Sequence, residues 1–176
     1  MAEIKLNVED GSLVEGANTY VSLEFADEYM AVHGKASWAE NDEETRKSKL
    51  IAATEYIDSL YNWKGVKKTP YQDLCFPREG IVDYDGYEVL GIPKNLQKAV
   101  CEAAFIALTQ DLFITSDSNG AVKKMAIEDA TEIEYFNSGE TKAEWTSVYQ
   151  VLDTLLKGLY HKKDAPRSIC VPVRWV

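Results

Sequence analysis

The sequence is poor in cysteine and histidine and lacks the patterns that metal sites, disulfide frameworks and membrane spans require. Its three cysteines, Cys75, Cys101 and Cys170, are widely spaced and odd in number, and its two histidines are His33 and His161. This excludes a disulfide scaffold and suits a reducing compartment. No apolar run approaches the ~20 residues that span a bilayer, and the start lacks a signal-peptide pattern. We therefore expect a cytoplasmic product with no metal, no cofactor and no membrane contact.

Sequence motifs of catalysis are also missing. There is no Gly-x-Ser-x-Gly elbow and no glycine-rich phosphate loop. His33 and His161 fit helix C-termini, where a cation is favourable, better than they fit a catalytic base. Asp83 and Asp85 could be forced into a metal site, but Asp85 and Gly86 are explained more simply as a turn. The sequence therefore predicts a protein that is not an enzyme.

Charge is distributed unevenly along a chain whose net charge is −10. Residues 1–44 contain 11 acidic and 2 basic residues, whereas residues 157–176 contain five basic residues and one acid. The overall balance speaks against strong binding to nucleic acid, because such binding depends on neutralising phosphates. The asymmetry can reflect a solvated acidic face with a basic end, or two ends that meet different partners.

Hydrophobic periodicity and breakers predict a mainly α fold. We expect helices over about 22–34, 42–60, 93–113 and 145–160, with Trp38 packed ahead of the second. A β-hairpin is expected over 81–89, turning at Asp85-Gly86, and a short β element over 122–135. The predicted fold is a four-helix bundle with a β-hairpin insertion between helices two and three. Residues 1–160 would form the domain and residues 161–176 an extended C-terminal tail.

One segment interleaves aromatic and basic residues as single-strand binders do: Trp63, Lys64, Lys67 and Lys68, followed by Tyr71. Arg46, Lys47 and Lys49 could extend this patch. The same pattern fits a helix end whose tryptophan returns to the core while the lysines are solvated. Because the chain is acidic, the second interpretation is favoured.

The C-terminal tail alternates apolar residues between two prolines and carries basic residues. Such a terminus is suited to binding a sheet edge or groove of another subunit, and it can equally cover the protein's own core. Both interpretations stay open. The docking residues would be Arg167, Ile169, Val171, Val173, Arg174 and Trp175.

Several short motifs together resemble a known family. They are Gly16-Ala17-Asn18-Thr19-Tyr20-Val21-Ser22, Tyr56-Ile57-Asp58, Trp63-Lys64-Gly65, the stretch from Gln72 to Gly80 with Phe76-Pro77-Arg78, and Ile92-Pro93. In order and spacing they resemble the phage family of DnaT-like single-stranded-DNA-binding proteins. Phe76 stands where that family usually has tryptophan. Members are similar in length and helical layout to head–tail connector, or adaptor, proteins of tailed phages.

The resemblance leads to two functional expectations. The preferred one is a virion protein at the head–tail junction, forming a ring with itself (twelve-fold by resemblance) and binding the portal and tail or neck proteins. An acidic lumen would let duplex DNA pass without specific binding. The tail would dock on the portal, and a hairpin of Tyr84, Asp85, Gly86 and Tyr87 would contact a neighbour or a tail component. The alternative is a DnaT-like replication accessory that binds single-stranded DNA through Trp63, Lys64, Lys67 and Lys68.

Overall fold

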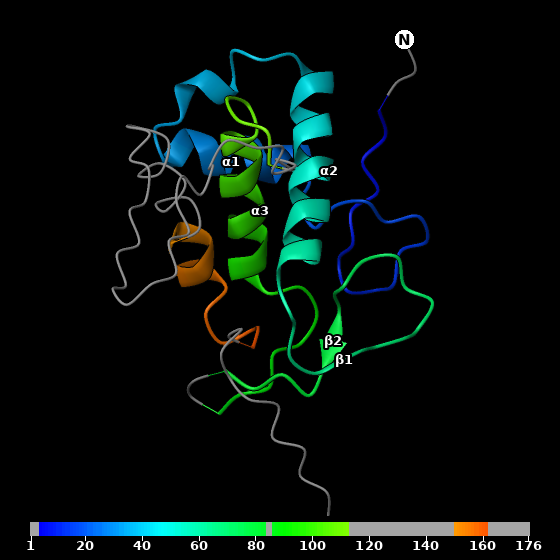
Figure 1. Ribbon diagram of the computed structural model, residues 1–176. Helices are drawn as coiled ribbons and strands as arrows, with labels where there is room; N and C mark the ends of the chain where they lie inside the picture. The colour runs from blue at the N-terminus through cyan, green and yellow to red at the C-terminus, as the bar shows by residue number, and fades with distance from the viewer. Residues whose placement is uncertain (1–3, 84–85, 113–149, 162–176) are drawn as a thin grey trace, which may run out of the picture.

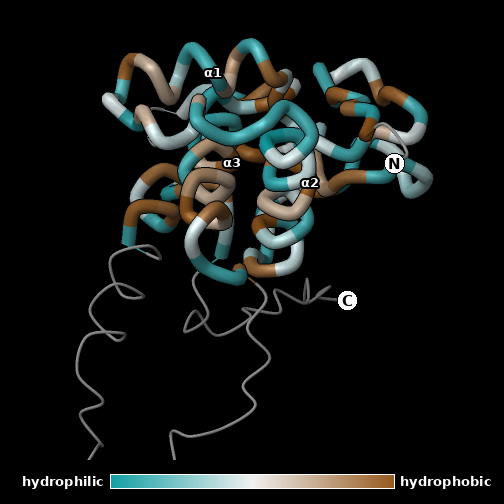
Figure 2. Tube along the Cα trace, turned by 90° about the horizontal axis from the view of Figure 1, so that it is seen from above, coloured by the Kyte–Doolittle hydropathy of each residue, from teal (hydrophilic) through white to brown (hydrophobic). Residues whose placement is uncertain are grey.

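The protein is mainly helical with a small two-stranded antiparallel hairpin, and the computed structural model describes residues 4–83, 86–112 and 150–161. Helices α2 (Glu43–Leu60) and α3 (Lys94–Ile106) run side by side in opposite directions (Figure 1). Helix α1 (Leu23–Val32) crosses one end of this pair, as both views show (Figures 1 and 2). A short 3-10 helix, η1 (Ala36–Trp38), joins α1 to α2.

The helices begin where the sequence predicts, and the capping hydrogen bond predicted at Ser22 is confirmed, whereas Asp42 makes no side-chain capping bond. The Ser22 hydroxyl accepts a hydrogen bond from the backbone N–H of Phe25 at 3.2 Å and caps α1. Helix α2 begins after Asp42 with Glu43 and Glu44 in its first turn, where the helix dipole favours carboxylates. Helix α3 begins directly after Pro93. Trp38 is 1% exposed, so the predicted packing ahead of α2 is also confirmed.

Two predicted helix ends are wrong. Helix α3 ends at Ile106 rather than near 113, and the Ile106 carbonyl accepts hydrogen bonds from the Thr109 N–H, the Thr109 hydroxyl and the Gln110 N–H in the turn that follows. The last helix includes residues 150–155 and ends before 160, since Gly158 adopts a positive φ of 96° that breaks the helix. The beginning predicted for that helix, near Trp145, lies outside the described residues.

The β structure differs in place from the predicted hairpin. The two named strands are β1 (Val66–Lys67) and β2 (Arg78–Glu79), which pair antiparallel with Val66 opposite Glu79. Residues 81–89 form an isolated antiparallel bridge, Val82 with Glu88, rather than two strands. The tip, Tyr84 and Asp85, and the predicted β element of residues 122–135 lie outside the described residues.

The core lies between α2 and α3 and is completed by buried side chains from α1, from the loop after α2 and from the 150–161 segment. Figure 2 shows hydrophobic residues alternating with hydrophilic ones along the helices, as one-sided burial requires. The 150–161 segment (orange in Figure 1) lies beside α3 and contributes to the core. The largest fully buried side chains are Trp38, Tyr20, Phe76, Met30, Leu50, Ile57, Ile81, Leu96, Leu152, Leu156, Val21 and Val100.

The N-terminal segment is ordered by a buried carboxylate. Glu9 is 2% exposed and accepts hydrogen bonds from the backbone N–H groups of Gly11, Leu13 and Val14, at 2.8 to 3.0 Å. These bonds satisfy the charge of Glu9 and hold Leu13 at a positive φ of 68°. No helix in the part of the chain that the structure describes is long and apolar enough to cross a membrane.

Candidate nucleic-acid interface

The lysine-rich segment of the sequence forms an irregular loop after α2. We call residues 63–72 the basic loop, because they include three lysines and no acid. Its base is fixed at two points. The Lys64 N–H donates to the Leu159 carbonyl at 2.9 Å, and the Lys68 N–H donates to the Pro77 carbonyl at 3.2 Å. The loop is therefore tied both to the 150–161 segment and to the chain that returns through β2.

Two long side chains hold the loop from inside. The Arg78 guanidinium donates to the carbonyls of Lys64 at 2.7 Å, Gly65 at 2.8 Å and Cys75 at 3.3 Å. The Gln72 amide donates to the carbonyls of Leu74 and Pro77 and accepts from the Thr69 N–H. These bonds satisfy backbone groups that a loop cannot pair within itself. Arg78 is thus a structural residue of the loop rather than a free cation.

A buried polar cluster anchors the loop to the helical domain. The Tyr20 hydroxyl donates to the Asp58 carboxylate, which also accepts from the Cys75 N–H at 2.8 Å. The Phe76 N–H donates to the Tyr20 oxygen at 3.0 Å. Burial raises the pKa of Asp58 above its usual value despite these bonds, and burial beside that carboxylate raises the pKa of Tyr20.

Trp63 does not lie on the surface of the basic loop. It is 6% exposed, with its ring edge-on to Phe76 at a centroid distance of 5.0 Å and tilted against Tyr61 at 5.4 Å. It cannot stack on a base without leaving the core. The interpretation that this tryptophan returns to the core is therefore confirmed, and its burial speaks against the alternative role of Trp63 as a nucleic-acid contact.

The outer side of the basic loop presents a different set of residues. Lys68 is exposed, whereas Lys64 and Lys67 are half-buried, and the Lys67 ammonium lies 3.4 Å from the Gln72 carbonyl. Tyr71 is 91% exposed and Val66 is 65% exposed. Tyr71 is the aromatic residue that the sequence pattern placed beside the lysines but did not select. Its neighbour Pro70 was the available signal, because a proline-broken loop runs over the surface of a domain.

The basic residues of α2 do not extend this surface. Arg46 pairs with Asp27 at 2.6 Å, and Lys47 pairs with Glu43 at 2.7 Å and with Glu44 at 3.4 Å. They lie in the first turns of α2, whereas the basic loop follows its last turn, about 20 Å away at 1.5 Å per residue. The ion pairs of Arg46 and Lys47, and the distance along α2, therefore speak against an extension of the basic loop through Arg46, Lys47 and Lys49.

The other predicted contact sites are only partly described. Gly86 and Tyr87 lie on the surface, with the Tyr87 N–H donating to the Asp83 carboxylate at 2.9 Å, while Tyr84 and Asp85 lie outside the described residues. All tail residues, Arg167 to Trp175, lie outside them too. Among the described residues, no group of three or more histidine, cysteine or acidic side chains is placed to hold a metal ion.

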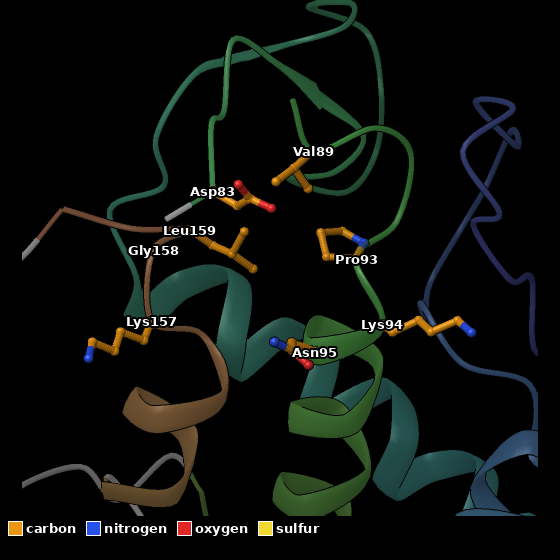
Figure 3. A pocket seen from close by; sticks show the side chains of 8 residues that line it. All are labelled: Asp83, Val89, Pro93, Lys94, Asn95, Lys157, Gly158 and Leu159. Atoms are coloured by element: carbon orange, nitrogen blue, oxygen red, sulfur yellow. The ribbon is translucent and has the colours of Figure 1, made fainter. Parts of the chain in front are cut away.

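A cleft of about 340 Å³ lies between the start of α3 and the turn before Tyr160. Figure 3 shows its lining: Asp83, Val89, Pro93, Lys94, Asn95, Lys157, Gly158 and Leu159. Asp83, Val89 and Leu159 converge on its centre, whereas the two lysines point outward on opposite sides (Figure 3). The centre is therefore apolar with one carboxylate.

The comparison with known protein families identifies the chain. Residues 4–174 match the family described as "Putative DnaT-like ssDNA binding protein". The match covers nearly the whole chain, so the chain belongs to this family. No curated protein and no solved structure matches it significantly.

This membership corrects the preferred functional expectation. The DnaT-like part of the resemblance is confirmed, whereas the similarity to head–tail connectors is not shown. The family assignment contradicts the connector function and its partners, namely a ring of copies, a portal and passing duplex DNA. A net charge of −10 does not describe the whole surface, because residues 63–72 contain three lysines and no acid.

Proposed function

We propose that this member of the DnaT-like family binds single-stranded DNA through the outer side of the basic loop, without catalysing a reaction. Lys64, Lys67 and Lys68 would lie along the phosphates. Tyr71 would stack on a base. The observation that carries the proposal is the exposure of Tyr71, 91%, within a lysine-rich loop that holds no acid.

Local charge explains how an acidic protein can bind DNA at this loop. The loop contributes three positive charges to a chain of net charge −10. Exposed charges act over a Debye length of about 8 Å at physiological salt, so carboxylates beyond that range are largely screened from a strand on the loop, whereas Asp73, next to the loop, and Glu79, opposite Val66, are not. At low salt their repulsion reaches further. Binding should therefore be modest, with a small number of released counterions.

Stacking selects single strands over duplex. A base in a duplex is covered on both faces by its neighbours, whereas a base in a single strand can lie flat on an aromatic ring. The phenol ring of Tyr71 has no ring partner among the described residues. The rigid base of the loop, held by Arg78 and Gln72, keeps the ring presented without the cost of ordering the chain on binding.

The test is a fluorescence anisotropy titration of labelled oligothymidylate over a series of salt concentrations. The Lys67→Ala/Lys68→Ala variant should bind more weakly. The negative slope of the logarithm of the association constant against log salt should become shallower by about 1.4, since each lost phosphate contact in a single strand removes about 0.7. The matched control is Lys49→Ala/Lys94→Ala, which changes net charge equally at sites away from the loop.

Two outcomes would overturn the proposal. One is a wild-type protein that shows no binding at low salt. The other is an equal loss in the control variant, which would mean that only net charge matters. A duplex of the same sequence, titrated in parallel, should bind more weakly than the single strand.

A further inference from the structure

A second surface, distinct from the basic loop, combines exposed apolar side chains with acidic residues. We call residues 81–91 the acidic hairpin, because they include Asp83, Asp85 and Glu88 and no lysine or arginine. Three large hydrophobic side chains are exposed here: Val82 at 50%, Tyr87 at 73% and Leu90 at 73%. Large apolar side chains exposed within one short segment are candidates for a contact.

The cleft of Figure 3 lies at the base of the acidic hairpin and, like the hairpin, combines apolar side chains with a carboxylate. Asp83 and Val89 belong to the hairpin and line the cleft together with Leu159 of the last described segment. Lys94 and Lys157 point away from the centre (Figure 3). An occupant of the hairpin and cleft would therefore meet apolar groups and carboxylates, so it should be apolar and positively charged.

The described chain ends beside this surface. Leu159 lines the cleft, and two residues later the His161 N–H donates to the Asn62 carbonyl at 2.8 Å. The 15 residues that follow contain four basic residues and one acid, and their apolar members are Ile169, Val171, Val173, Trp175 and Val176. At about 3.3 Å per residue they reach up to ~50 Å, which is ample for a return to the hairpin.

We propose that residues 162–176 bind the acidic hairpin and its cleft in the same molecule. The described residues of the hairpin carry two negative charges, Asp83 and Glu88, and the C-terminal residues carry a net three positive charges, so the two are complementary. The exposed apolar side chains of the hairpin would be covered by the apolar residues of that segment. The attachment of the tail next to the cleft makes the contact intramolecular, which favours it over a contact with a second copy at low concentration. The proposal is independent of DNA binding by the basic loop.

Native Cys170 allows a direct test in the full-length chain. In the Leu90→Cys variant, a short bismaleimide should link residues 90 and 170 within one molecule, as read by peptide mass mapping at micromolar protein. Burial raises the pKa of the Cys75 thiol to about 11 and that of Cys101 to about 12, so both should react slowly. The matched control is Val32→Cys, which is 77% exposed on α1, far from the acidic hairpin (Figure 1).

The linked fraction should clearly exceed that of the control and should not depend on protein concentration. Equal linking in both variants would overturn the proposal. A product that joins two chains and grows with concentration would also overturn it, in favour of a second copy. A second measurement reverses a charge on the hairpin. Glu88→Lys should lower the linked fraction by about twofold, which is the effect expected of one screened surface ion pair. Adding Arg174→Glu in the same chain should restore the linked fraction.

Discussion

The inner and outer sides of the loop between α2 and β2 use their residues in opposite ways. On the inner side, the side chains of Arg78, Gln72 and Asp58 form hydrogen bonds with the backbone of the loop. On the outer side, Tyr71 and Lys68 are exposed. Three inner residues, Asp58, Gln72 and Arg78, belong to the sequence motifs that resemble the family. Among the residues of the proposed function, Lys64 lies within one of these motifs, whereas Lys67, Lys68 and Tyr71 lie between them.

This difference between the two sides of the loop leads to a general prediction. Substitutions on the inner side should lower the free energy of unfolding and leave the exposed residues of the outer side unchanged. Substitutions on the outer side should weaken DNA binding and leave the free energy of unfolding unchanged.

The largest effect is expected at Gly65. A Cβ there would lie 2.2 Å from the Glu79 carbonyl oxygen and 2.9 Å from the Ile81 side chain, and its φ is +66°. Gly65→Ala should lower the free energy of unfolding by roughly 3 kcal/mol or more, because backbone of β2 must move as well as the residue itself. Urea denaturation followed by circular dichroism measures this change.

Gly80→Ala is the matched control for the effect of contact. Its φ of +72° is similar, but a Cβ would meet nothing within 4 Å. It should cost only about 1 kcal/mol, from the left-handed conformation alone. Equal losses in the two variants would show that β2 does not approach Gly65 as closely as the structure has it.

The second effect is pH-dependent and concerns Asp58. Asp58→Ala leaves the Tyr20 hydroxyl and the Cys75 N–H without their acceptor, which should cost about 2 kcal/mol at neutral pH. Burial raises the folded-state pKa of Asp58 above 3.8, so its proton is bound more tightly in the folded protein. This pKa difference therefore stabilises the folded protein fully below the unfolded-state pKa of Asp58. That stabilisation is lost as pH rises through the folded-state pKa.

The difference in unfolding free energy between wild type and Asp58→Ala should consequently widen as pH falls from neutral. Thermal or urea unfolding of both proteins in the same buffers measures it. A difference that shrinks on acidification would mean that the hydrogen bonds, rather than burial, dominate the pKa of Asp58.

The helix starts could be predicted from the sequence, whereas the two strands could not. The helix starts at Ser22, Asp42 and Pro93 were predictable, because capping and proline act locally. The strands were not, because β1 and β2 are two residues each and depend on Arg78 reaching back to Lys64 and Gly65 across the loop. Nothing in the local pattern marks a contact between residues so far apart.

The candidate site shows the same limit. The lysines at 64, 67 and 68 were found because charge is visible in the sequence. The charge of the chain favoured a buried Trp63, but the charge pattern offered no reason to select Tyr71 as the exposed aromatic residue beside the lysines. The structure separates them by packing: Trp63 meets Phe76, whereas Tyr71 follows Pro70 at the outside of the loop.

The third effect tests this separation on the outer side. Tyr71→Ala should weaken binding to oligothymidylate by about 1–3 kcal/mol, or roughly 5- to 150-fold, with unfolding free energy unchanged within about 0.5 kcal/mol. Tyr87→Ala is the matched control, because Tyr87 is also an exposed tyrosine, at 73%, but lies on the acidic hairpin. Equal losses in both variants would mean that DNA also contacts the hairpin.

The smallest effect is expected at a single lysine of the outer side. Lys68→Ala removes one exposed charge, while its backbone bond to Pro77 stays in place. The salt slope of single-strand binding should fall by about 0.7, and stability should not change measurably. Lys68→Arg keeps the charge and should keep the slope. If Lys68→Ala instead destabilised the fold as Gly65→Ala does, the outer side would not be free for a ligand, and the distinction between the two sides of the loop would fail.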